Sequence, residues 1–132
     1  MSSFNLNIVT PIRELKLGTV SYARCPGIDG QFGIMNNHRE GIFALSIGEL
    51  KITQNGEDEY FATGGGFAEI MDNSVKLLVE SIESSKEINI NRAQESLKRA
   101  KSRKTKDDPE INFTRAEASL MRALNRLRVS KR

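Results

Sequence analysis

Hydrophobic and polar residues alternate along the first part of the chain. Phe4, Leu6 and Ile8 are separated by asparagines, which is the period of a strand with one buried face. In residues 15–22 the apolar positions change parity across Gly18, as they do where a strand contains a β-bulge. The chain therefore opens with two predicted strands, the second of them bulged.

Six more short strands follow from the same alternation. They are predicted at residues 32–35, 42–47, 50–53, 60–63, 67–71 and 75–80. The turn signals between them are residues 26–27, 36–37, 48, 55–56, 64–66 and 72–73. Asn55-Gly56 is the strongest, because Asn-Gly between alternating runs is typical of a two-residue hairpin. Many short strands with turns every ~8–12 residues predict a sandwich or barrel.

The period changes to that of a helix after residue 86. Ile90, Ala93, Leu97 and Ala100 are spaced as one narrow stripe of a helix. Either Asn89 or Asn91 can cap its start, and residues 101–109, which end in proline, are expected to terminate it.

A second helix is predicted for the rest of the chain. Its apolar stripe is Phe113, Ala116, Leu120, Leu124 and Leu127. Thr114 and Glu117 fit a capping box, and Asn112 is a rival cap. Both stripes are narrow, so the two helices are expected to form a hairpin that holds its neighbour weakly.

Charge and glycine divide the chain at nearly the same place. Residues 1–86 carry a net charge of −4 and contain all ten glycines, whereas residues 87–132 carry +7 and contain none. Glycine supports tight turns and weakens helices. The predicted fold class is α+β: an N-terminal antiparallel β-sandwich in residues 1–86, followed by a C-terminal two-helix hairpin in residues 87–132.

Composition excludes several classes of protein. The chain has 132 residues, of which 38% are hydrophobic, so it is expected to form a real core. A lone Cys25 excludes an internal disulfide framework and a multi-thiolate zinc site. No leader pattern and no apolar run of ~18 residues is present, so the protein is expected to be soluble, with at most peripheral attachment to a membrane.

Candidate catalytic chemistry is sparse. The only histidine, His38, falls in a predicted turn and has no local nucleophile or acid partner. Gly27, Gly30 and Gly33 are spaced like a phosphate loop, but a strand follows them and no Lys-Ser/Thr closes the motif. No catalytic residue and no metal site is predicted.

Arginines in the second half form a more informative pattern. Arg92, Arg99 and Arg103 fall on one face of the first helix, and Arg122 and Arg126 share a face of the second, with Arg115 seven residues earlier. In a hairpin, arginines from both helices could converge on one anion, because guanidinium groups bind phosphate bidentately. Two other interpretations stay open: a solvated basic face, or a basic surface that docks on an acidic protein.

Nucleic acid is a competing partner, since the sequence pI is about 9.2. Against it, the β half is acidic and poor in exposed aromatic residues, which single-strand binders interleave with basic ones. The alternative function is therefore a small β-domain nucleic-acid-binding protein with a basic helical tail. The favoured prediction is that the protein does not bind nucleic acid.

Three motifs together resemble a known family. They are GQFGIMNNH at residues 30–38, GGFAEI at 65–70, and ININRA at 88–93, which resembles an Ile/Leu-Asp-x-x-Arg-Ala opening of a helix. Their order and spacing resemble the ε subunit of the F-type ATP synthase, bacterial type, over the whole length. The resemblance departs from the family pattern at Asn36 and Glu40, where prolines are common, and at Asn89, where the family has Asp.

This resemblance implies a non-catalytic rotor subunit. The sandwich would join the γ subunit to the c-ring, with Gln31 and His38 at the rotor interface. The mobile hairpin would extend toward acidic segments of the catalytic β subunits and block ATP hydrolysis. The implied location is peripheral, on the cytoplasmic face of the energy-coupling plasma membrane, with only indirect membrane contact through the c-ring.

The resemblance also implies a regulatory ligand. No cofactor is required, but some bacterial members bind ATP in the folded hairpin. The matching positions in this sequence are Glu83, Ile88, Asn89, Arg92, Ala93, Arg99, Arg122 and Arg126. Asn caps a helix about as well as Asp, so the change at residue 89 alters the polar contact offered to the nucleotide rather than the helix start.

Overall fold

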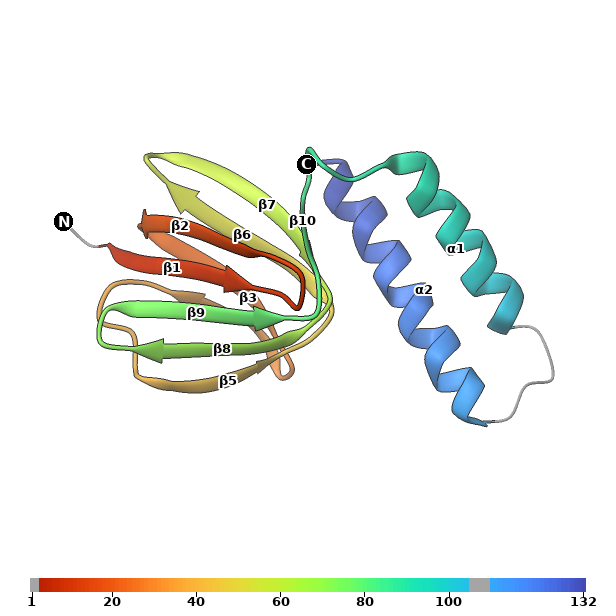
Figure 1. Ribbon diagram of the computed structural model, residues 1–132, viewed down its shortest axis with the longest axis horizontal. Coiled ribbons are helices and arrows are strands. Elements are labelled where there is room, and N and C mark those ends of the chain that lie inside the picture. The colour runs from red at the N-terminus through yellow and green to blue at the C-terminus, as the bar shows by residue number, and fades with distance from the viewer. Residues whose placement is uncertain (1–2, 105–109) are drawn as a thin grey trace.

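The computed structural model describes residues 3–104 and 110–132, without the side chains of residues 103, 104 and 110–114. Ten strands are followed by two helices in these residues (Figure 1). The strands are β1 (Phe4–Val9), β2 (Glu14–Val20), β3 (Tyr22–Gly27), β4 (Gly30–Ile34), β5 (Gly41–Leu45), β6 (Gly48–Gln54), β7 (Glu57–Thr63), β8 (Gly66–Met71), β9 (Ser74–Val79) and β10 (Ile82–Ser84). The helices are α1 (Ile90–Lys104) and α2 (Glu110–Ser130).

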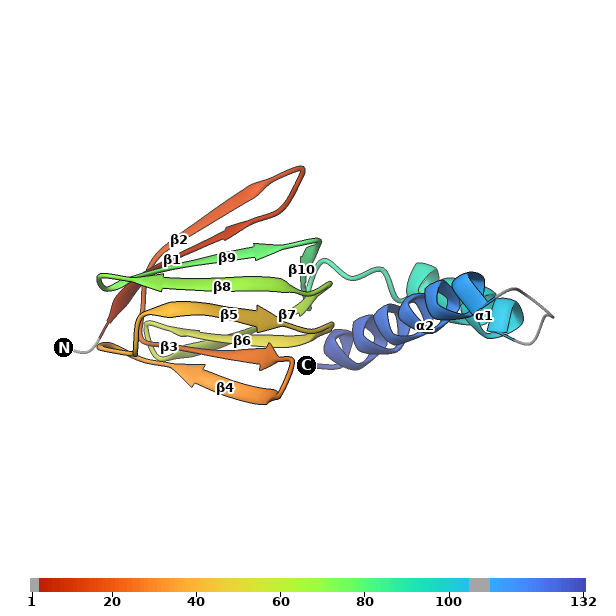
Figure 2. The same ribbon diagram turned by 90° about the horizontal axis from the view of Figure 1, so that it is seen from below.

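The strands form a β-sandwich, as the sequence predicted. Hydrogen bonds connect them in the order β10-β7-β6-β3-β5-β8-β9-β1-β2, with β4 paired to β3. This path folds over on itself, so that β1, β2, β8 and β9 lie on one side and β3, β4 and β6 on the other (Figure 2). Leu6, Ile8, Leu50 and Leu77 are almost completely buried between the two layers. Burial of such side chains stabilises each by about 1.5–3 kcal/mol.

The predicted bulge and hairpin turns are confirmed. The register between β1 and β2 shifts after the pair Leu6–Gly18, and Gly18 has φ +73°. Asn55 and Gly56 also have positive φ and connect β6 to β7 as a two-residue turn. Asp72 and Asn73 connect β8 to β9 in the same way.

Several strand predictions were wrong in detail. Residues 15–22 belong to two strands, because Ser21 separates β2 from β3. Pro26-Gly27 is the end of β3 rather than a turn, and β10 was missed because three residues are too few to show a period. The sandwich is also not purely antiparallel, since β1 pairs with β9 in parallel.

The predicted start of the first helix is confirmed, with Asn89 as the cap. The Asn89 side-chain Oδ1 accepts a hydrogen bond from the backbone N–H of Arg92 at 3.1 Å. The predicted start of the second helix was wrong. It begins at Glu110, so Asn112 and Thr114 lie inside the helix.

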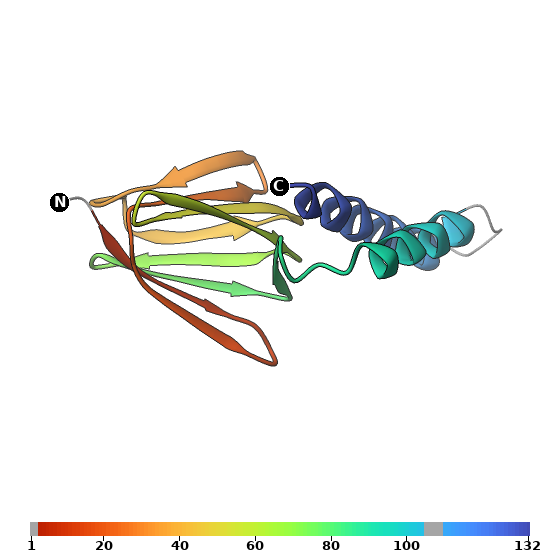
Figure 3. The ribbon, with the colours of Figure 1, turned by 90° about the horizontal axis from the view of Figure 1, so that it is seen from above.

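The buried stripes of the helices also differ from those predicted. Ile90 and Leu124 are 49% and 45% exposed, whereas Ala123 and Val129 are buried. The buried positions differ because each helix packs against the other helix along most of its length, while the end of α2 also packs against the sandwich. The two helices run side by side away from one end of the sandwich, and the hairpin of β1 and β2 diverges from the other strands (Figure 3).

The single cysteine is part of the sandwich core. Cys25 is 0% exposed, and burial raises the pKa of its thiol to about 12. Because the thiolate is the reactive form, we expect a thiol reagent at pH 8 to label the folded protein at least about 100-fold more slowly than the unfolded chain. Labelling in buffer and in guanidinium measures this ratio. Rapid labelling with an unchanged circular dichroism spectrum would contradict the buried position.

Candidate functional site: the hairpin groove and the sandwich faces

Small residues bring the two helices together. Ala93 and Ala100 of α1 and Ala116 and Ala123 of α2 are buried. Alanine side chains are short, so the helix backbones can approach closely, and larger side chains next to this contact are displaced to its sides. The contact therefore has a groove beside it whose walls come from both helices.

Arginine and serine line this groove. Its volume is about 300 Å³, and its lining residues are Ser96, Arg99, Ser119, Arg122, Ala123 and Arg126. The Arg99 guanidinium donates to the Ser96 hydroxyl at 3.3 Å, and the Arg122 guanidinium donates to the Ser119 hydroxyl at 3.2 Å. The two helices thus present matching Ser–Arg pairs to one space, as the arginine pattern predicted for Arg99, Arg122 and Arg126.

The third arginine already has an anionic partner. Arg126 Nε lies 2.7 Å from Glu83 Oε1, and a second contact of 3.3 Å joins the same two groups. Glu83 is in β10, so this ion pair connects the groove to the sandwich. Among the described side chains, Arg99 and Arg122 donate to serines, whereas Arg126 would be shared between a phosphate in the groove and Glu83.

The remaining predicted nucleotide residues lie elsewhere. Ala93 is fully buried between the helices, Ile88 packs in the cluster of Ala62 and Val129, and Asn89 is the cap of α1. Arg92 is exposed and does not line the groove, although its spacing from Arg99 puts both on one face of α1. The structure thus brings three of the eight predicted residues into the groove, with Glu83 bonded to one of them. Arg103 lies among the residues whose side chains are outside the described set.

Sequence reasoning missed the two serines. Ser96 and Ser119 each stand three residues before an arginine of the groove, a spacing that places the two side chains next to each other on a helix. The repeated Ser-x-x-Arg pattern was the available signal. Two hydroxyls and three guanidinium groups form a donor set that suits phosphate oxygens.

The predicted rotor-interface residues lie on the sandwich. Gln31 is exposed in β4 rather than in a loop, and His38 is half-buried in the connection from β4 to β5. The Nδ1 of His38 donates to the Arg39 carbonyl at 3.0 Å, and its ring meets Phe43 edge-on with centroids 5.8 Å apart. Gln31, His38 and Phe43 line one hollow of about 560 Å³ together with Ile28 and Ile42.

An exposed apolar surface continues from this hollow across β5, β8 and β9. Phe67 of β8 pairs with Ala44 on one side and Leu78 on the other. Ile42, Phe67, Met71 and Leu78 are 70%, 52%, 54% and 39% exposed. On the same face, Glu69 lies between Phe67 and Met71 and pairs with Ile42 and Lys76, so charged side chains interrupt the apolar surface. Exposed large apolar side chains on an open sheet mark a surface for a protein partner. We refer to these four apolar residues as the outer sheet face.

The hairpin docks on the sandwich through the end of α2. Val129 is fully buried against Ala62, Ile88 and Tyr60. Beside it, the Asn125 amide donates to the Gly48 carbonyl at 2.8 Å. This docking contact is small and partly polar. The weak hold that the narrow stripes predicted stays a prediction.

A second contact links the β1–β2 turn to the segment before α1. The Arg13 guanidinium donates to the Ile82 carbonyl at 2.6 Å and forms an ion pair with Glu87 at 3.3 Å. A hydrogen bond from the Ser84 backbone and the contact with Arg13 lower the pKa of Glu87. The stabilisation from this carboxylate is present above its ordinary pKa and is lost as the pH falls through the lowered value. It is small because both side chains are substantially exposed.

Two further observations limit the chemistry. Among the side chains that the structure describes, His, Cys, Asp and Glu do not gather in groups of three that could bind a metal ion. Neither helix, over its described residues, is long and apolar enough to cross a membrane.

Comparisons with known proteins identify the family. Residues 3–85 match the model of the ATP synthase delta/epsilon chain β-sandwich domain, and residues 86–131 match that of its long α-helix domain. An ATP synthase epsilon chain from Syntrophomonas wolfei is 41% identical over 103 residues, 77% of this chain and 75% of that one. One from Nitratidesulfovibrio vulgaris is 40% identical over 101 residues, 76% and 75% of the two chains.

Two solved structures share the fold. A chain of the Euglena gracilis mitochondrial ATP synthase (OSCP/F1/c-ring) matches with a TM-score of 0.79 at 20% identity, covering 90% of this chain and 76% of that one. A chain of the Tetrahymena thermophila central stalk and c-ring matches with a TM-score of 0.67 at 16% identity, covering 96% and 95%. The fold defines a β-sandwich with an appended helical hairpin. The chain belongs to the delta/epsilon chain family of ATP synthases.

Proposed function

We propose that this chain is a non-catalytic rotor subunit in the central stalk of a proton-translocating ATP synthase. Its sandwich joins the γ subunit to the c-ring, and its helical hairpin inhibits ATP hydrolysis. Family membership supports the assignment to the complex. The structural relatives are chains of an OSCP/F1/c-ring assembly and of a central stalk and c-ring. The observation that carries the two-part function is the small, partly polar contact between a sandwich with its own core and a basic hairpin.

The outer sheet face is the proposed binding surface for the γ subunit. It is apolar and open to solvent, and Gln31 and His38 lie at its border beside the hollow lined by Ile42. Burial of such a surface stabilises a complex by about 25 cal/mol per Å² before the cost of association is subtracted. The neighbouring loop with His38 is the proposed contact to the c-ring.

A fragment of residues 1–86 tests the rotor assignment and the predicted domain boundary together. We expect it to fold, because the sandwich core is formed entirely by residues before Ser84, and to bind the γ subunit. Gel filtration with purified γ measures the complex. Phe67→Asp should abolish binding, whereas Glu57→Lys, at the exposed β6–β7 turn, should not. An unfolded fragment would contradict the division of the chain into two domains. A folded fragment that does not bind the γ subunit would contradict the proposed rotor interface.

The hairpin is the proposed inhibitory element. Residues 87–132 carry a net charge of +7, and electrostatic attraction of this size steers a basic segment to an acidic surface. On release from the sandwich, the helices would extend toward acidic segments of the catalytic β subunits. The docked arrangement described above would then be the non-inhibitory state.

ATP is the proposed regulatory ligand of the docked hairpin. The groove fits phosphate because it combines Arg99, Arg122 and two serines in one space. A ligand that binds only the docked state shifts the population toward it by its differential affinity. No required cofactor is proposed. The predicted contacts of Ile88, Asn89, Arg92 and Ala93 with the nucleotide would need a local rearrangement from the positions described above.

Calorimetric titration of the isolated chain with ATP tests this ligand. We expect Arg122→Gln to weaken binding about tenfold or more, since one charge-assisted hydrogen bond is worth about 1.5–3 kcal/mol. Lys98→Gln removes the same charge from an exposed position of α1 outside the groove, and it should bind ATP normally. Equal affinities for the two variants, or no heat with the unchanged chain, would remove ATP from the proposal and leave the rotor role intact.

Location and competing partners follow from the same proposal. The subunit would lie at the periphery of the membrane complex, on the cytoplasmic face, and would meet the membrane only through the c-ring. Nucleic-acid binding receives no support from the contacts, because Arg126 and Arg132 of the basic half are paired with Glu83 and Glu49 of the sandwich.

A further inference from the structure

A second basic hollow lies where the end of α2 meets the sandwich. It has a volume of about 490 Å³ and is lined by arginines from both parts of the chain: Arg24 of β3, and Arg128 and Arg132 of the α2 end. Gln31, Ser46 and Glu49 complete its polar lining. We call it the junction cleft. It shares no lining residue with the hairpin groove.

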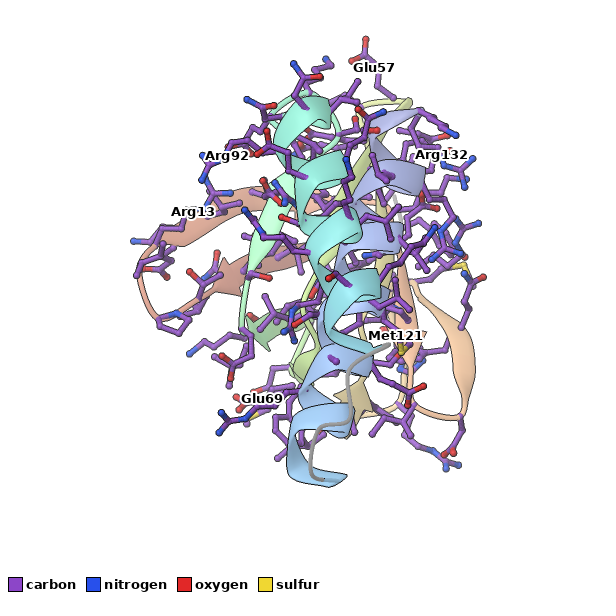
Figure 4. All side chains as sticks on the ribbon, turned by 90° about the vertical axis from the view of Figure 1, so that its right-hand side faces the viewer. Arg13, Glu57, Glu69, Arg92, Met121 and Arg132 are labelled. Carbon is purple, nitrogen blue, oxygen red and sulfur yellow. The ribbon has the colours of Figure 1, made fainter. Side chains whose placement is uncertain are left out.

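The two basic sites are built from different residues. Arg132, which lines the junction cleft, lies on one side of the hairpin, and Arg92 lies on the other (Figure 4). Because the cleft and the hairpin groove have no lining residue in common, a ligand in the cleft would use none of the side chains that line the groove.

The carboxylate of Glu49 lies between two of the arginines of the junction cleft, Arg24 and Arg132. Glu49 is 8% exposed and accepts hydrogen bonds from Arg24 at 3.1 Å and from Arg132 at 2.8 Å on each of its oxygens. The hydrogen bonds that Arg132 donates to Glu49 raise the pKa of Arg132. This carboxylate shows that the geometry of the cleft suits a bidentate anion.

The arginines still have unused donors. Arg24 Nε is buried without a hydrogen-bond partner among the described residues. Arg128 makes one long hydrogen bond, of 3.4 Å, to the Asn125 side chain of its own helix. Three arginines against one glutamate leave a formal charge of +2 around a hollow of small-molecule size.

We propose that the junction cleft binds a small multivalent phosphate anion, with Arg24 and Arg128 as its main ligands. Guanidinium groups at a partly desolvated site bind phosphate oxygens bidentately. Arg24 and Ser46 come from the sandwich, whereas Arg128 and Arg132 come from α2. A bound anion would therefore add contacts that exist only while the hairpin is docked, and it would stabilise docking by mass action.

Inorganic pyrophosphate titrated into the full-length chain tests the cleft. We expect saturable binding that Arg128→Gln weakens about tenfold or more. Lys131→Gln is the matched control, because it removes the same charge from an exposed residue near the end of α2 that does not line the cleft. Arg24→Gln supplies a second loss from the sandwich side, and circular dichroism shows whether each variant is folded.

The outcomes separate the cleft from the groove. Loss of binding in Arg128→Gln and Arg24→Gln, with normal binding in Lys131→Gln, supports the proposal. Loss in Arg99→Gln alone would place the anion in the hairpin groove and overturn it. Equal weakening by Arg128→Gln and Lys131→Gln would indicate unspecific charge attraction, and the absence of saturable binding would also overturn it. ATP binding in the groove is tested with a different variant, Arg122→Gln. The proposal for the cleft and the proposal for the groove can therefore be contradicted independently.

Discussion

Replacement of Val129 with aspartate is expected to detach the hairpin from the sandwich while the sandwich stays folded. Val129 is 0% exposed and contacts the cluster of Ala62 and Ile88. A carboxylate there would lose its hydration without a cationic partner in the cluster, at a cost of several kcal/mol. The remaining contacts at the end of α2 are the Asn125–Gly48 hydrogen bond and the ion pairs of Arg126 and Arg132, each worth about 1 kcal/mol or less because solvent screens the part-exposed arginines. The balance therefore favours release.

Hydrogen exchange with peptide resolution measures this release. The backbone amides of α2 should exchange faster in Val129→Asp, and protease should cut the segment before α1, whereas amides of β6 and β9 should stay protected. Met121→Asp adds the same charge at an exposed position of α2 and should leave exchange unchanged. Protection of α2 equal to that of the unchanged chain would show that docking does not depend on the Val129 contact. Global unfolding would show that the sandwich needs the helices.

The assembled complex offers a functional measurement of the same variant. If the docked hairpin is the non-inhibitory state, ATP hydrolysis by a synthase that carries Val129→Asp should be inhibited more strongly than with Met121→Asp. Equal hydrolysis in the two complexes would separate docking from inhibition.

Replacement of Gly66 with alanine is expected to destabilise the sandwich strongly. Gly66 has φ +150°, and an added Cβ would overlap the carbonyl oxygen of Leu78 and lie 2.8 Å from the Cα of Val79. The contact atoms belong to the β9 backbone, which cannot move without breaking its pairing with both β8 and β1. Backbone strain and overpacking together cost about 3–5 kcal/mol. That is a large part of the 5–15 kcal/mol that stabilises a typical domain.

Denaturant unfolding of Gly66→Ala and Gly56→Ala gives the comparison. Gly56 also has positive φ, +79°, but no atom lies within 4 Å of the position its Cβ would take. Its replacement should therefore cost only the conformational strain, about 1–2 kcal/mol. Similar losses of unfolding free energy in the two variants would show that the contact with β9 is not the cause.

The fold was predictable because its signals are local. Alternation near Phe4, the Asn55-Gly56 turn and the Asn89 cap each depend on a few neighbouring residues. The failures were at positions where distant contacts decide. The three-residue strand β10 exists because it pairs with β7, and the start of α2 did not follow its best capping pattern.

The candidate site was predictable in part for the same reason. The faces that carry Arg99 and Arg122 follow from helical spacing alone, and the hairpin brings them to one groove. The exposed outer sheet face could not be predicted, since a strand buried on both sides and one with an open apolar face have similar sequences.

The sequence by itself determined the elements, their turns, the charge of the basic half and the faces on which its arginines lie. Only the tertiary structure decided how those arginines are used. Arg126 is paired with Glu83, 43 positions away, and Arg132 with Glu49, 83 positions away. Helical periodicity fixes the direction of a side chain on its own helix, but an ion pair also needs a partner whose position depends on how the whole chain folds.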